Sequence, residues 1–164
     1  MFKKQDENYL APAVVHIASR LEDEPRTQKM IVDQVKSQNN LFNQQDDIKR
    51  SIRSRVQKIR RNTDLELSLV RSEQYLEYIV SKINQNIPEK VIEEAQQNCR
   101  MIEDTKGIGR SKVAIAGCSL KAALNQRLKD KTITPRQFQD VTAMHRNTFS
   151  NNVTYFEEQG LLNF

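Results

Sequence analysis

The sequence predicts a protein built almost wholly from α-helices. Its 164 residues include only 4 glycines and 4 prolines, so few positions interrupt a helix. Apolar residues recur at spacings of three and four among charged ones, which is the period of a half-buried helix, and we find no convincing strand. A chain of this length can form one domain or two small ones and bury about 70% of its unfolded surface.

The first helices are predicted within the segment VVHIASRLEDEPRTQKMIVDQV. An apolar helix is followed by a charged loop and by Thr27, which can cap a short amphipathic helix. The same order returns in SLKAALNQRLKDKTITPRQFQDV, where Thr134 is the cap. Identity between the two segments is low, but their shared periodicity predicts that the first third of the chain is a partial copy of the last third.

A basic helix is predicted at residues 48–61. Its narrow apolar stripe consists of Ile48, Ile52, Val56 and Ile59. The cations on the opposite face are Lys49, Arg50, Arg53, Arg60 and Arg61, with Arg55 and Lys58 at the flanks. Because a merely solvated face usually mixes both signs and this helix contains no acid, we expect it to contact phosphates. Five such contacts would make log K fall with log salt at a slope of about −4 to −5.

Three further helices are predicted between residues 72 and 128. Ser72 can cap the first, and Pro88 stands near the start of the second, which ends before the loop TKGIGRSK. Ser111 can cap the third, whose small residues allow neighbouring helices to approach closely. This composition is typical of a central, buried helix.

The last two helices are predicted to form a helix–turn–helix. Thr134, Pro135 and Gln137 fit a capping box that opens the first of them. In the second, Phe149, Val153 and Phe156 lie on one side. The opposite side is polar, and it is either a solvated face or a recognition surface for the major groove, with Asn147, Thr148, Ser150, Asn151 and Thr154 toward bases or phosphates.

Charge is distributed in three blocks. Residues 1–61 carry 13 basic and 8 acidic side chains, residues 62–105 carry 4 and 9, and residues 106–164 carry 9 and 4. Two basic blocks around an acidic one suggest a polyanion on one side and a different partner on the other. The loop KGIGRSK lacks the spacing of a nucleotide-binding loop, but with Lys106, Arg110 and Lys112 it could hold a DNA phosphate.

Several classes of function are disfavoured. The sequence has 2 cysteines and 2 histidines, with no spacing typical of a zinc site, so we expect Cys99 and Cys118 to be packed helix residues and predict no metal or cofactor. No constellation argues for catalysis, and we expect no enzyme. Neither a signal peptide nor a membrane span is predicted, which favours a cytoplasmic protein, nucleoid-associated if archaeal and nuclear if eukaryotic.

The order of these segments resembles the cyclin-fold core of archaeal transcription factor B and eukaryotic transcription factor IIB. The features that match are a small-residue central helix after Gly109, Arg110 and Ser111, a Thr-capped helix–turn–helix, and the repetition of this pattern. The resemblance implies a partial first repeat at residues 1–63, with its last three helices, and a complete five-helix repeat at residues 64–164. The family commonly has arginine at the position of Ser150 and proline at that of Lys112.

The resemblance implies a transcription initiation factor that binds promoter DNA together with TATA-binding protein, mostly through phosphates. RNA polymerase would be a third partner, through N-terminal parts of the family that this sequence lacks. The expected DNA-binding residues are Lys49, Arg50, Arg53, Arg60, Arg61, Arg110, Lys112, Arg146, Asn147, Thr148, Ser150, Asn151 and Thr154. The alternatives are a cyclin-like adaptor that binds a protein and, less favoured, a dimeric helix–turn–helix repressor of viral or plasmid type.

Overall fold

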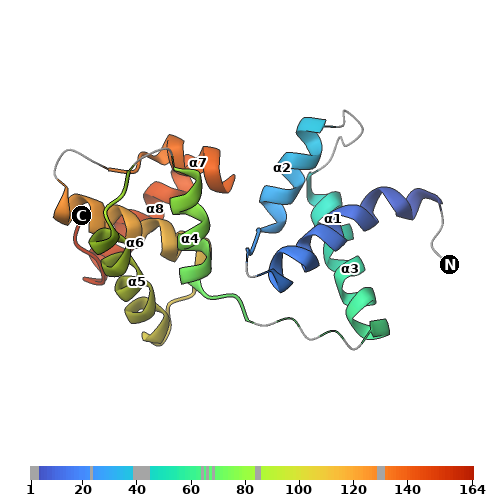
Figure 1. Cartoon of the computed structure of the whole chain (residues 1–164), viewed down its shortest axis with the longest axis horizontal. Helices are drawn as coiled ribbons and strands as arrows, with labels where there is room; N and C mark the ends of the chain where they lie inside the picture. Colours follow the sequence, from blue (N-terminus) through green and yellow to red (C-terminus); the bar gives the residue numbers. More distant parts are fainter. Residues whose placement is uncertain are drawn as a thin grey trace. The chain divides into compact units, whose positions relative to one another are not determined.

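The computed structural model describes residues 4–22, 24–38, 45–63, 65, 67, 69–83, 86–128 and 132–164. In these residues the chain forms eight α-helices and no strand (Figure 1), which confirms the predicted all-α class. The helices are α1 (Lys4–Leu21), α2 (Gln28–Gln38), α3 (Gln45–Thr63), α4 (Ser72–Lys82), α5 (Glu89–Asp104), α6 (Lys112–Arg127), α7 (Pro135–Thr142) and α8 (Arg146–Glu158).

The chain divides into two compact units. The first unit spans Met1–Leu69 and contains α1 to α3, and the second spans Val70–Phe164 and contains α4 to α8. We expected the division between residues 63 and 64, where the basic helix ends. The boundary between the two units lies six residues later, between Leu69 and Val70.

In the first unit, α1 packs on α2 and α3, and α2 packs on α3. Ile31, Val32 and Ile52 form a small buried cluster, against which Val56 packs. Thr27 caps α2 as predicted, since its Oγ1 accepts a hydrogen bond of 3.1 Å from the backbone N–H of Met30.

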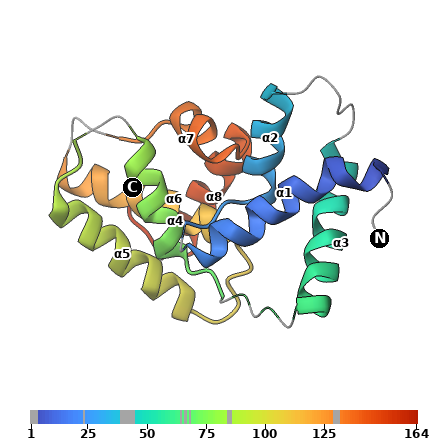
Figure 2. The ribbon, with the colours of Figure 1, turned by 45° about the vertical axis from the view of Figure 1, so that its right-hand side comes forward.

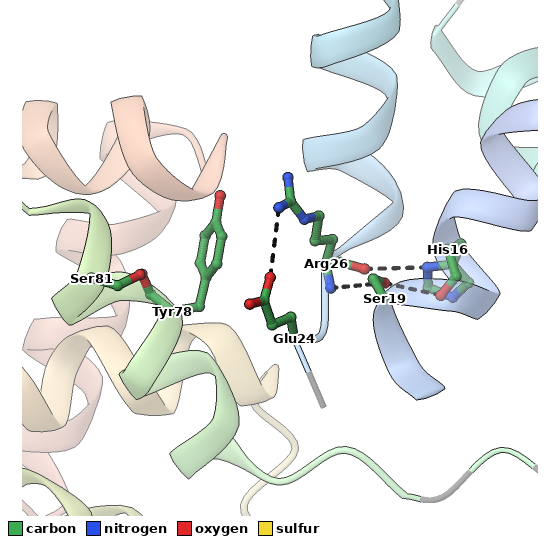
Figure 3. A network of polar contacts seen from close by, with 6 residues as sticks. All are labelled: His16, Ser19, Glu24, Arg26, Tyr78 and Ser81. Atoms are coloured by element: carbon green, nitrogen blue, oxygen red, sulfur yellow. Dashed lines mark hydrogen bonds and ion pairs between the residues drawn. The ribbon is translucent and has the colours of Figure 1, made fainter. Parts of the chain in front are cut away.

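A polar network joins α1 to the loop before α2 (Figure 3). The ring Nδ1 of His16 donates to the carbonyl oxygen of Arg26 at 3.2 Å, and the Arg26 N–H donates to Ser19 Oγ at 3.4 Å. Burial is the main reason that the pKa of His16 lies below its ordinary value; the bond to Arg26 opposes this shift and the charge of Arg20 adds to it. The network therefore holds the loop in place with a half-buried, neutral imidazole.

The second unit is built around α6, which packs against α4, α5 and α8 (Figures 1 and 2). Residues 113–120 and 122–124 of α6 are all buried, as predicted for a central helix. Gly117 of α6 lies directly beneath the ring of Phe138 from α7, so any Cβ at this position would collide with the ring. Glycine at this position therefore lets the Phe138 ring lie against the backbone of α6.

The predicted caps are right at two helices of this unit and wrong at one. Ser111 Oγ accepts from Ala114 N at 3.3 Å, and Thr134 and Gln137 form the expected capping box. Ser72 is not a cap but the first residue of α4, and it is fully buried. Its backbone N–H, which has no partner within α4, donates to the Glu103 carboxylate of α5 at 2.7 Å.

Candidate nucleic-acid interface

The helix–turn–helix consists of α7, a turn at residues 143–145, and α8. Ala143 ends α7 in the left-handed conformation with φ 58°. The rings of Phe138 and Phe149 stack with centroids 4.1 Å apart, which fixes the two helices against each other. Thr142 Oγ1 donates to the Phe138 carbonyl and accepts from Met144 N, so the turn itself is also held by hydrogen bonds.

Helix α8 has one buried and one exposed face. Phe149, Asn152 and Phe156 are buried, whereas Val153, which we expected among them, is half-buried. Asn152 is a buried polar residue that the apolar pattern missed, and its Nδ2 donates to the Thr148 carbonyl at 2.6 Å. The predicted interface residues of this helix are all exposed: Arg146, Asn147, Thr148, Ser150, Asn151 and Thr154.

The first turn of α8 is organised by two side chains. His145 is the N-cap, and its Nδ1 accepts a hydrogen bond of 3.3 Å from Asn147 N. Arg146 Nε donates to Gln139 Oε1 of α7 at 3.0 Å. Because a glutamine is neutral, this bond orients the guanidinium without neutralising its charge.

The loop before α6 brings Arg110 to α8. The Arg110 guanidinium carbon lies 3.8 Å from the centre of the Tyr155 ring, which is a cation–π contact. Arg110 is exposed, and no carboxylate of the described residues pairs with it. Sequence reasoning expected Arg110 at the interface but missed Tyr155, because nothing local connects residues 110 and 155.

Lys112, which we also expected at the interface, has a carboxylate partner. Its Nζ forms an ion pair of 2.9 Å with Glu103, whose carboxylate also holds the start of α4. Burial alone would raise the pKa of Glu103, but the hydrogen bonds from Lys112 and Ser72 outweigh it and hold this pKa below its ordinary value. The amide of Ala114 donates to Ser111 Oγ, so this amide at the helix start is not free to bind a phosphate.

Two other arginines of the second unit are paired with acids, as Lys112 is. Arg100 forms an ion pair of 2.6 Å with Glu73, and Arg127 pairs closely with Glu94. In contrast, Arg110 and Arg146 have a tyrosine ring and an amide as partners. In the part of the chain that the structure describes, no paired carboxylate therefore compensates the positive charge beside the polar face of α8.

Helix α3 carries the second predicted surface. Arg50, Arg53, Arg60 and Arg61 are exposed, while Ile52 is fully buried on the other side. The Nε of Arg53 donates to Gln28 Oε1 at 3.0 Å, and that of Arg60 to the Leu65 carbonyl at 3.4 Å, so both have neutral acceptors. The side chain of Lys49 lies outside the described residues. Helix α3 belongs to the first unit and α8 to the second.

The two cysteines are free and buried, as expected for packed helix residues. Burial raises the pKa of Cys99 to about 11, although the neighbouring hydroxyls of Ser119 and Ser72 lower it, and burial also raises the pKa of Cys118. Among the described residues, no group of three or more His, Cys, Asp or Glu side chains could hold a metal ion. No helix in that part of the chain has the length and apolar character needed to cross a bilayer.

No protein-family model matches this chain, and no curated protein matches it at a significant level. The likeness to transcription factor B thus stays a prediction from its motifs. What the site itself offers is a rigid helix–turn–helix whose second helix presents uncharged polar side chains between two arginines.

Proposed function

We propose that this protein binds double-stranded DNA, with α8 in the major groove. The observation that carries the proposal is the exposed polar face of α8, flanked by Arg110 and Arg146, neither of which is paired with a carboxylate of the described residues. A helix is about 10–12 Å across with its side chains, which matches a groove about 12 Å wide. The acids of α8, Glu157 and Glu158, lie at its C-terminal end, away from the turns that usually contact bases.

Base reading by this helix would be weak. The exposed face lacks an arginine at Ser150, and a bidentate arginine–guanine contact contributes about 1–3 kcal/mol of discrimination. Asn147 and Asn151 are exposed amides that suit adenine. The proposed complex is therefore held mainly by phosphates, with a modest preference for A·T pairs.

The basic face of α3 provides further phosphate contacts in this proposal. Its arginines are exposed, and the acceptors of Arg53 and Arg60 among the described residues are neutral oxygens, which do not offset the positive charge. With about five contacts, log K would fall with log salt at a slope of about −4 to −5. The complex would dissociate steeply as salt rises.

The narrower proposal is a transcription initiation factor of the B type, which binds promoter DNA together with TATA-binding protein. It is supported by the sequence resemblance and by the succession of five helices that ends in a helix–turn–helix. The assignment of the two units as a partial and a complete cyclin-like repeat is part of this narrower proposal. In such a complex the factor would also recognise the bend of the DNA, which is indirect readout.

A cyclin-like adaptor that binds a protein is the second candidate. The observation that favours it is the apolar side of α1, where Val14, Val15 and Leu21 are 48%, 45% and 54% exposed. Exposed apolar side chains on one helix are typical of an interaction surface. This candidate requires no DNA binding and assigns α3 a solvated face.

Fluorescence anisotropy of a labelled TATA-containing duplex tests both candidates. The protein is titrated with and without TATA-binding protein at two salt concentrations. Binding that weakens steeply with salt supports the DNA proposal, and tighter binding with TATA-binding protein supports its narrower form. No binding at either salt concentration contradicts the DNA proposal and favours the adaptor.

A further inference from the structure

We infer that Tyr155 is a positioning residue that holds Arg110 against a backbone phosphate at the wall of the groove occupied by α8. The inference rests on the proposed DNA binding and deepens it, because it names the chemical group that Arg110 recognises. Tyr155 was not among the residues that the sequence assigned to the interface, and its role follows from the contact between the loop and the helix.

The tyrosine ring is itself held in place. It makes an edge-to-face contact with Phe156, with centroids 5.4 Å apart and an interplanar angle of 70°. Phe156 is fully buried in the core of the second unit. Arg110 thus stacks on a half-buried ring that is anchored to the core, although its own loop runs through two glycines, Gly107 and Gly109. Stacking lowers the entropy that this long side chain would lose on binding.

Stacking also leaves the binding groups of Arg110 available. The guanidinium donors lie in the plane of the group, so a ring against its face does not occupy them. A fork of parallel N–H groups matches two oxygens of a phosphate. Lys112, two residues later in the same loop region, cannot serve in this way without breaking its ion pair with Glu103.

The position of Tyr155 on α8 selects phosphate over base. Asn147, Asn151 and Thr154 occupy the middle of the exposed face, and Tyr155, which is half-buried, flanks it one turn after Asn151. When a helix lies in the major groove, the middle of its exposed face meets base edges, and its flanks meet the strands that line the groove. Arg110 therefore faces a phosphate, which carries charge but no sequence information.

Salt dependence of duplex binding tests the inference in the full chain. The variants are Arg110→Gln, Tyr155→Met, the double variant and Tyr155→Phe, with Lys90→Gln as a control that removes one exposed charge from α5. Tyr155→Met removes the ring but keeps an apolar side chain beside Phe156. Anisotropy is recorded over a series of salt concentrations with a labelled duplex, and thermal unfolding by circular dichroism verifies that each variant folds.

Arg110→Gln and Tyr155→Met are each expected to reduce the slope of log K against log salt by about 0.9, the value of one phosphate contact. The double variant should show the same reduction and no more, since both changes remove one contact. Tyr155→Phe and Lys90→Gln should keep the wild-type slope. A wild-type slope for Arg110→Gln or Tyr155→Met, or reductions that add in the double variant, would overturn the inference while leaving DNA binding intact. If the wild-type protein binds no duplex, the proposed function fails first and the inference falls with it.

Discussion

Each unit contains a long helix, a short helix capped by threonine and a third helix, but the long helix is buried to a different extent in the two units. In the first unit, α1 packs on α3, and the short helix α2, which Thr27 caps, also packs on α3. In the second unit, α6 packs on α8, and the short helix α7, which Thr134 caps, also packs on α8. The central helix α6 is covered by α4 and α5, and most of its residues are buried. Within its own unit, α1 packs on α2 and α3 and leaves Val14, Val15 and Leu21 exposed. A similar apolar helix is thus a core element or a surface element depending on its neighbours.

The third helices differ in chemistry. Helix α3 exposes a row of arginines, whereas α8 exposes uncharged polar residues. The arginine beside α8 is Arg110, which comes from the loop before α6 and stacks on Tyr155. If both bind DNA, α3 contributes mainly charge and α8 mainly fit to the groove. The following predictions test this division, in order of decreasing effect.

Reversal of charge on α3 should have the largest effect. Arg53, Arg60 and Arg61 are exposed, and their replacement by glutamate removes three cations and adds three acids. Loss of three phosphate contacts lowers the salt slope by about 2.7, and repulsion weakens binding further. Anisotropy with the labelled duplex measures both quantities. Unchanged binding by this triple variant would assign α3 a solvated face and leave α8 as the DNA contact.

Truncation of an apolar side chain should lower the free energy of unfolding much more in α6 than in α1. Leu120 of α6 is fully buried, so Leu120→Ala should lower the free energy of unfolding by about 2–5 kcal/mol. Val14 of α1 is 48% exposed, and Val14→Ala should change it by no more than about 0.5 kcal/mol. Urea unfolding followed by circular dichroism gives both values. A large loss for Val14→Ala would mean that the exposed side of α1 is covered in the folded protein.

The substitution Gly117→Ala tests how tightly the Phe138 ring of α7 packs against α6. A methyl group at this position meets the Phe138 ring, so Gly117→Ala should destabilise the protein by about 1–3 kcal/mol through overpacking. Gly109 is the matched control, because nothing lies within 4 Å of a Cβ added there. Equal losses of stability for Gly117→Ala and Gly109→Ala would contradict the tight contact between Gly117 and the Phe138 ring.

The acid dependence of stability should be the smallest effect. Hydrogen bonds lower the pKa of Glu103 in the folded protein, so this group stabilises the fold above its ordinary pKa of 4.5 and loses that contribution as pH falls through the lowered value. Glu103→Gln should therefore flatten the decline in unfolding free energy below about pH 4.5. Urea unfolding at several pH values measures the decline. The exposed Glu93→Gln is the control, and an identical profile for the two variants would speak against the Glu103 clamp.

Much of the fold was predictable from short stretches of sequence. Thr27, Ser111 and Thr134 cap helices as expected because a cap depends on a side chain and an amide within three residues of it. The buried faces of α3 and α8 followed from apolar spacing, since the period of a helix fixes which residues share a side. The burial of Asn152 was not predicted from apolar spacing, because a polar side chain can be buried when it donates a hydrogen bond to the preceding turn of its helix.

Contacts between distant residues were not predictable. Glu103 accepts a hydrogen bond from the Ser72 amide and forms an ion pair with Lys112. The Tyr155 ring stacks with the Arg110 guanidinium. These partners are separated by up to 45 positions in the sequence, so only the packing of the helices brings them together. The sequence by itself determined that the chain is helical, where α2, α6 and α7 begin and which faces carry charge, because these properties depend on neighbouring residues. The tertiary structure alone decided which cations are paired with acids and which stay available beside α8, because a charge is neutralised by whatever the fold places within reach of it.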